Sequence, residues 1–192
     1  MKTIICAILC LTITGIAKAQ HASFGLKGGL NISNIHNSNG TYYNPAAGVH
    51  AGGLVHIHLT KHWAVQPELV FSTQGAKFRN AGTETNYNLS YVNVPVLAQY
   101  MFANGFRVQA GPQVGFLVHA ASRNNELKQH TMDDYNKVDL ALSAGASYQI
   151  PNSGFGLDAR FNLGVTDISK NNAVNSTNRG FQAGVFYLFR NQ

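Results

Sequence analysis

The 192-residue sequence contains only two cysteines, Cys6 and Cys10, and both lie within its first ten residues. This stretch has the form of a secretory signal peptide, with a positively charged start, an apolar run over residues 4–16 and a small-residue cleavage motif ending at Ala19. Cleavage there predicts a mature chain, residues 20–192, that has no cysteine. That absence excludes a disulfide framework, a thiolate metal site and a cysteine nucleophile.

The chain also lacks an apolar run long enough to cross a membrane as a helix, because the run at 4–16 falls short of the ~20 residues required. No heptad repeat or helical apolar stripe follows residue 20. The formal net charge is +6, but the cations are scattered and form no basic cluster. Together with export, this scatter argues against a nucleic-acid partner.

What the mature chain does contain is an alternation of apolar and polar residues, broken by stretches rich in Asn, Gly and Ser. In residues 154–166, for example, every second position is apolar. The alternation predicts eight β-strands, over residues 24–33, 46–59, 63–76, 89–102, 105–119, 138–150, 154–166 and 179–190.

The predicted connections alternate strictly between long and short. The short ones are 60–62, 103–104 and 151–153, and the long, polar ones are 34–45, 77–88, 120–137 and 167–178. Short periplasmic turns and longer extracellular loops are typical of transmembrane β-barrels. We therefore expect an all-β, eight-stranded antiparallel up-and-down transmembrane barrel, with both chain ends on the periplasmic side.

Periodicity alone leaves open which face of the sheet points outward. A soluble, lipocalin-like ligand-binding barrel would turn its apolar face inward. An eight-stranded barrel has room only for its own side chains, and the apolar faces are too bulky for that space. Aromatic residues near the predicted strand ends, such as Trp63 and Phe116, also suit two interfacial girdles. Both observations favour an apolar exterior and a polar lumen.

The short turns predict the register of three hairpins. A turn centred on Lys61 pairs His56 with Gln66, and a turn centred on Asn104 pairs Gln99 with Gln109. A turn at residues 152–153 pairs Ser147 with Asp158. In each hairpin the polar faces meet, as pleated strands require.

Six charged residues lie well inside strands, all on the polar register and with three of each sign. Because a buried unpaired charge is very costly, we expect them to form a mutual network that plugs the lumen. A narrow, porin-like polar channel remains the alternative. The six residues are Lys27, Glu68, Arg107, Asp139, Asp158 and Arg160.

Several segments resemble the PorT-like outer-membrane β-barrel proteins of the Bacteroidetes porin family. They are Gly25 to Asn31, Val65 to Gly75, Tyr91 to Leu97, Gly111 to Gly115 and Asp158 to Ile168. Asn93 departs from that family, where an acidic residue is commoner. The resemblance covers nearly all of the mature chain and implies an eight-stranded outer-membrane barrel, but it transfers no active site.

Two groups of residues have the types needed for chemistry. His56 and His58 share a strand face, with His50, His62 and Glu68 near enough to be considered as metal ligands. His119, Ser122 and Glu126 lie toward the extracellular side but have no recognisable catalytic spacing. Ordinary packing or solvated loops explain both groups better, so we expect no enzyme activity, no metal and no cofactor.

The sequence thus predicts a monomeric protein of the outer membrane whose partners are membrane lipid and an extracellular protein or ligand. The long loops are the expected contact surface, since loops on a rigid scaffold commonly carry recognition. The loop 120–137 is the longest and most charged of them.

Gel mobility separates the transmembrane barrel from the lipocalin-like alternative. We expect the protein to resist SDS until it is boiled, to migrate differently before and after boiling, and to fractionate with outer membranes. Recovery from the periplasm without detergent, and with no mobility shift, would instead indicate a soluble barrel.

Overall fold

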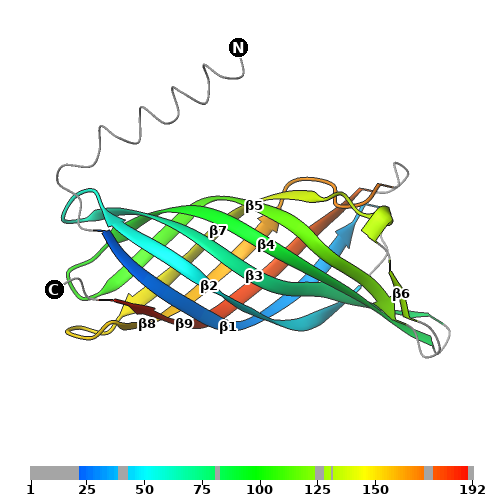
Figure 1. The fold of residues 1–192 in the computed structure, drawn as a ribbon, viewed down its shortest axis with the longest axis horizontal. Helices are drawn as coiled ribbons and strands as arrows, with labels where there is room; N and C mark the ends of the chain where they lie inside the picture. The colour runs from blue at the N-terminus through cyan, green and yellow to red at the C-terminus, as the bar shows by residue number, and fades with distance from the viewer. Residues whose placement is uncertain are drawn as a thin grey trace, which may run out of the picture.

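A computed structural model describes residues 22–38, 43–80, 83–123, 128–130, 132–170 and 175–189. Eight long strands form a barrel, and a short strand and one 3₁₀ turn lie outside the ring (Figure 1). The strands are β1 (Ala22–Asn37), β2 (Asn44–His58), β3 (Trp63–Asn80), β4 (Thr83–Met101), β5 (Phe106–Arg123), β6 (Lys128–His130), β7 (Val138–Gln149), β8 (Phe155–Gly164) and β9 (Ser176–Leu188), with η1 at Met132–Asp134. In these parts of the chain, no helix is long and apolar enough to span a membrane.

The barrel is closed and entirely antiparallel. Its strands follow the order β4-β3-β2-β1-β9-β8-β7-β5, and β4 pairs with β5 to complete the ring. The first and last strands meet as expected, with Gly29 opposite Gly184. β1 begins and β9 ends at the end of the barrel that carries the short turns (Figure 1). The predicted eight-stranded up-and-down topology is therefore confirmed.

The register of the three short hairpins is also as predicted. Gln99 lies opposite Gln109 and Ser147 opposite Asp158. In the first hairpin, Nδ1 of His56 lies 3.3 Å from Oε1 of Gln66. Two of the turns carry the positive φ angle that tight reversals need, 88° at Gly105 and 60° at Asn152.

The two faces of the sheet differ in the way that the alternation predicts. Large apolar side chains point outward and are strongly exposed, for example Leu30 at 67 % and Phe24 at 60 %. Polar side chains point into the lumen and are buried, among them His56 and Ser72 at 0 %. This orientation is the reverse of a lipocalin-like barrel, in which the apolar face lines a ligand cavity.

Aromatic rings collect on the outer surface at the end with short turns. Tyr100 packs against Trp63 and Phe102, with ring centroids 5.2 and 5.0 Å apart. On the far side of the barrel, Phe155 packs on Tyr187 at 4.7 Å. Such contacts, continued around the rim, form the interfacial girdle of a membrane barrel.

At the end of the barrel that carries the long loops, the strands extend further than the alternation predicts. Residues 77–88, expected to be a long loop, are mostly strand, because β3 continues to Asn80 and β4 starts at Thr83. β6 pairs with the top of β5 inside the expected loop 120–137. Residues 77–88 are mostly polar because the outer face of the sheet meets water rather than lipid here, which removes the alternation of apolar and polar residues. The prediction of a long loop at 77–88 was therefore wrong.

A bulge in β5 is a second departure from the predicted alternation. The pairing of β4 with β5 shifts by one residue between Ser90 and Tyr91, so His119 faces Ser90 while Leu117 faces Tyr91. Beyond the bulge Ala120 is fully buried, whereas a strict period of two from Leu117 would place it outside. Bulges of this kind are common at barrel rims and change which residues face inward.

Strand curvature leaves some inward positions without room for a side chain. A Cβ added at Gly145 would lie 2.2 Å from the backbone oxygen of Ala159 and 2.7 Å from Cα of Arg160. At the outward position Gly28, the nearest atom would be 3.5 Å away. Glycine is therefore needed at Gly145 because the neighbouring strand approaches so closely.

We predict that Gly145→Ala destabilises the folded barrel by about 2 kcal/mol through overpacking, while Gly28→Ala costs far less. Urea unfolding of the two variants in lipid vesicles measures the difference. Equal unfolding midpoints for the two variants would contradict the close strand approach.

Candidate functional site

Four of the six predicted lumen charges form a compact cluster, which we call the charge cluster. Nζ of Lys27 lies 2.8 Å from Oδ1 of Asp158 and 3.3 Å from Oε2 of Glu68. Arg160 donates to both oxygens of Glu68, at 2.8 and 3.0 Å, and to Oδ1 of Asp158 at 3.1 Å. The four side chains are at most 3 % exposed.

The charge cluster crosses the lumen. β3, which carries Glu68, and β8, which carries Arg160, lie four strands apart in a ring of eight, so they are opposite walls. Lys27 reaches the same carboxylates from β1, midway between those two strands. An ion pair that joins opposite walls fills the width of a barrel whose interior has room only for side chains.

Neutral amides complete the coordination of the two carboxylates. Gln66 donates to Glu68 at 2.7 Å, and Gln109 donates to Asp158. Two cations therefore face two carboxylates, and each carboxylate receives additional hydrogen bonds. Such saturation is what a buried ion pair needs to offset its desolvation.

Arg107 and Asp139 are buried in the lumen but lie apart from the charge cluster. Each is the second residue of its strand, and β5 and β7 begin at opposite ends of the barrel. Arg107 donates to the side chain of Gln149. Asp139 accepts from Asn178 at 2.9 Å and Thr166 at 3.0 Å. The expected network of six residues therefore contains only four of them. Alternation predicts which face of the sheet a residue lies on, but it does not predict the residue's position along the barrel axis.

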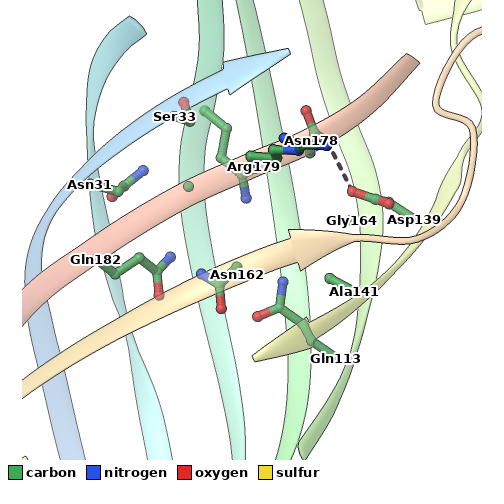
Figure 2. A pocket seen from close by; sticks show the side chains of 12 residues that line it. Asn31, Ser33, Gln113, Asp139, Ala141, Asn162, Gly164, Asn178, Arg179 and Gln182 are labelled. Carbon is green, nitrogen blue, oxygen red and sulfur yellow. Dashed lines mark hydrogen bonds between the residues drawn. The ribbon is translucent and has the colours of Figure 1, made fainter. Parts of the chain in front are cut away.

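A small polar cavity lies between the charge cluster and the extracellular end (Figure 2). Its volume is about 20 Å³, enough for roughly one water molecule. Carboxamides dominate its wall, including Asn31, Gln113, Asn162 and Gln182, and Asp139 adds a carboxylate held by Asn178. The lumen at this level is polar but nearly filled.

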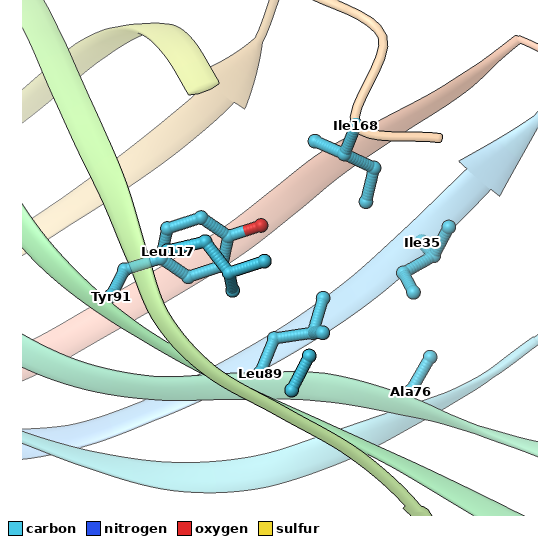
Figure 3. Close-up of a cluster of buried hydrophobic side chains, with 7 residues drawn as sticks. Ile35, Ala76, Leu89, Tyr91, Leu117 and Ile168 are labelled. Carbon is cyan, nitrogen blue, oxygen red and sulfur yellow. The ribbon is translucent and has the colours of Figure 1, made fainter. Parts of the chain in front are cut away.

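Above this cavity the lumen is closed by apolar side chains, an arrangement that the sequence did not lead us to expect (Figure 3). Ile168, from the segment after β8, is fully buried, and Tyr43, Met132 and Tyr135 pack around the same core. We call this cluster the apolar plug; its buried members are Ile35, Ala76, Leu89, Tyr91, Leu117, Ala120 and Ile168.

Two loop segments are joined into a lid that holds Ile168 in place. The backbone N–H of Asn136 donates to the carbonyl of Ile168 at 2.8 Å, and the Asn136 side chain donates to the carbonyls of Asp167 and Ser169. The Asp167 carboxylate accepts from the N–H groups of Ser169 and Ser176, each at 2.9 Å. The lid, residues 132–137 and 165–170, is therefore a bonded structure.

The lid also partly buries a phenol. Tyr135 forms an isolated bridge with Ser169 and packs against the apolar plug. Burial raises the pKa of the Tyr135 phenol above its ordinary value.

The histidines considered as metal ligands have other neighbours. His56 and His58 pack ring to ring at 4.5 Å, and His56 contacts Gln66. Glu68 is held by Lys27 and Arg160. Within the residues whose positions are described, no three His, Cys, Asp or Glu side chains are grouped as metal ligands.

Of the residues considered for catalysis, the structure describes His119 and Ser122, which both lie on β5. His119 lies at the β5 bulge, opposite Ser90, and Ser122 pairs with Tyr87 in the rising part of the sheet. Glu126 lies outside the described residues, as does the predicted signal peptide.

The sequence contained one indication of the lid. Ile168, Met132 and Tyr135 are large apolar residues in stretches that are mostly polar and that the alternation predicts to be loops. Their burial follows from the narrow mouth beneath them, which no sequence periodicity describes.

Comparison with known proteins extends these findings. The model of a family described as the outer membrane protein β-barrel domain matches residues 18–170. No curated protein is significantly similar in sequence.

Several solved structures of outer-membrane β-barrels share the fold. Neisserial surface protein A superimposes with a TM-score of 0.63 at 14 % identity, over 88 % of this chain and 99 % of that one. Ail, the attachment invasion locus protein of Yersinia pestis, gives 0.53 at 13 % over 88 % and 99 %, in a crystal structure with the heparin analogue sucrose octasulfate. OprG of Pseudomonas aeruginosa gives 0.50 at 13 % over 92 % and 100 %. At these identities the likeness concerns the fold alone.

We predict that Glu68→Gln destabilises the barrel by about 3 kcal/mol, because it leaves two buried cations with one carboxylate. Adding Lys27→Met restores a one-to-one balance between Arg160 and Asp158. The double variant should therefore lose less stability than the sum of the single variants. Urea unfolding in vesicles completes this cycle, and strictly additive losses would show that the four charges are not coupled.

Proposed function

The chain belongs to the outer membrane protein β-barrel domain family, and from that membership we propose a closed, non-enzymatic barrel that acts through its extracellular surface. The family and the fold locate it in the outer membrane. The observation that carries the proposal is the ion pairing of Arg160 with Glu68 across the lumen. A barrel blocked at this level transports no solute, so its contacts with the outside are made by its ends.

A second closure supports the same proposal. The apolar plug blocks the extracellular mouth independently of the charge cluster, because it draws on Ile168 and the lid rather than on Lys27 or Arg160. A passage would require both to open. Two barriers in series favour a scaffold over a channel.

The extracellular end offers the surface that such a scaffold would present. It consists of the lid, the tall β3–β4 hairpin and the part of loop 120–137 that the structure describes. The lid holds its shape through backbone bonds such as Lys170 N–H to the Asp134 carbonyl at 3.0 Å. A rigid surface binds with less loss of conformational entropy than a loose loop. We propose an extracellular protein or ligand as its partner, and the Ail complex is an example of this fold with such a ligand.

Three finer expectations belong to the same proposal. The motifs at residues 25–31 and 158–168 support a PorT-like identity within the family. The apolar run and cleavage motif that end at Ala19 support export by a cleaved signal peptide. We propose that the barrel works as a monomer surrounded by outer-membrane lipid.

A narrow polar channel is the second candidate. It is favoured by the carboxamide-lined cavity and by buried polar atoms with no hydrogen-bond partner in the described structure, among them Nε2 of His50 and Nδ2 of Asn93. Such atoms suit a hydrated interior.

Conductance in planar bilayers distinguishes the two candidates. We predict no ion current through the wild-type barrel. Replacing Lys27, Glu68, Asp158 and Arg160 together by alanine, or Ile168 alone by alanine, should leave it closed, because one barrier remains in each variant. Only the combined five-residue variant should conduct.

Each variant is first checked for the heat-dependent gel shift that marks a folded barrel. Outward-facing Leu30→Ala serves as the matched control and should not conduct. A steady current through the wild-type barrel would contradict the closed scaffold and support the narrow channel.

A further inference from the structure

The lumen of the barrel holds charged side chains of both signs, whereas the described charged side chains on the outer face of the strands are all cationic. Every acidic strand residue whose side chain is described, namely Glu68, Asp139 and Asp158, is buried in the lumen. The outward-facing, exposed charges on the same strands are cations, namely Lys77, Arg123 and Arg179. All three lie toward the extracellular end. We call them the cationic rim.

Arg179 lies where the apolar exterior ends. It is paired with Leu163 on β8 and Asn34 on β1, and it precedes Phe181 by two residues, about 7 Å along the strand. Leu163 and Phe181 are exposed apolar residues, whereas Asn34 is polar. The guanidinium has no hydrogen bond or ion pair with any residue that the structure describes. An arginine at this height extends its head group toward the lipid–water boundary.

Lys77 and Arg123 occupy a second position on the rim, further from the membrane centre. Both flank Asn86 in one cross-strand row, with Lys77 opposite Asn86 and Asn86 opposite Arg123. Two strand spacings place the Lys77 and Arg123 backbones about 10 Å apart. The row lies on the rising part of the sheet, beyond the exposed Phe71 of β3.

Among the residues that the structure describes, the opposite end of the barrel has no comparable set. Of the cations whose side chains are described there, Lys61 in the β2–β3 turn is the exposed one, and Arg107 is buried in the lumen. Cations are thus concentrated where the outer surface leaves the extracellular leaflet. Phosphate oxygens are the anionic groups that guanidinium and ammonium groups bind best at a lipid head-group level.

We propose that the cationic rim binds the phosphate groups of anionic lipid head groups in the outer leaflet. Arg179 contacts phosphates at the boundary of the apolar exterior. Lys77 and Arg123, with the Asn86 amide between them, contact phosphates that stand higher on larger head groups. The barrel then holds specific lipids around itself in addition to being solvated by them.

Native mass spectrometry of the detergent-extracted barrel, with lipid A as the probe, tests this inference. The wild type should retain bisphosphorylated lipid A in preference to dephosphorylated lipid A. Each rim cation near an anionic head group is expected to contribute about fivefold in affinity. Replacing Lys77, Arg123 and Arg179 together by glutamine should therefore reduce retention by about a hundredfold.

Lys61→Gln is the matched control, since it removes one exposed cation from the other end and should leave retention unchanged. All variants should keep the heat-dependent gel shift, because the rim side chains are exposed and pack against no core. Equal retention by the triple variant, or equal retention of the dephosphorylated lipid, would overturn the proposal.

A competition arm identifies the source of the phosphate. Millimolar inorganic pyrophosphate should displace little bound lipid A, because the acyl chains remain against the apolar exterior. Full displacement by pyrophosphate would show a site for free phosphate and would refute binding of the lipid.

Discussion

The ion pairing of Arg160 with Glu68 across the lumen constrains the rest of the barrel. Opposite walls of an eight-stranded ring can be joined by two side chains only if the interior is narrow and the strands curve tightly. That curvature is why Gly145 must lack a side chain where it faces Arg160. At the height of the charge cluster it also leaves no interior space for the bulky apolar residues of the strands, which consequently face outward.

Much of the fold follows from the sequence because two independent patterns agree. Alternation identified the inward face of each strand, and the tight turns fixed the pairing of Gln99 with Gln109 and Ser147 with Asp158. Both are local properties, since a strand has a period of two and a short turn sets the register on either side. When each strand pairs with the next one in the chain, the order of the strands is complete once the first and last strands pair.

What the sequence could not provide depends on height and on contacts distant in sequence. Arg107 and Asp139 share the inward face with the charge cluster but sit near opposite ends of the barrel. The bulge beside Leu117 reverses which residues of β5 face inward, and no residue type in the sequence indicates its position. Ile168 became part of the apolar plug through bonds with the lid segment around Asn136. These features depend on three-dimensional neighbours, whereas periodicity reports only on the strand itself.

The positions of the charge-cluster residues along the chain also affect how the strands assemble in the membrane. Lys27 and Glu68 lie on β1 and β3, while Asp158 and Arg160 lie on β8, nearly at the other end of the chain. An intermediate that has inserted only the first strands carries Lys27 and Glu68 with half of their partners missing. Because a buried charge without its partner is costly, insertion and closure are coupled, and the last strands complete the neutralisation of the first. The lumen charges thus make folding into the membrane a concerted event.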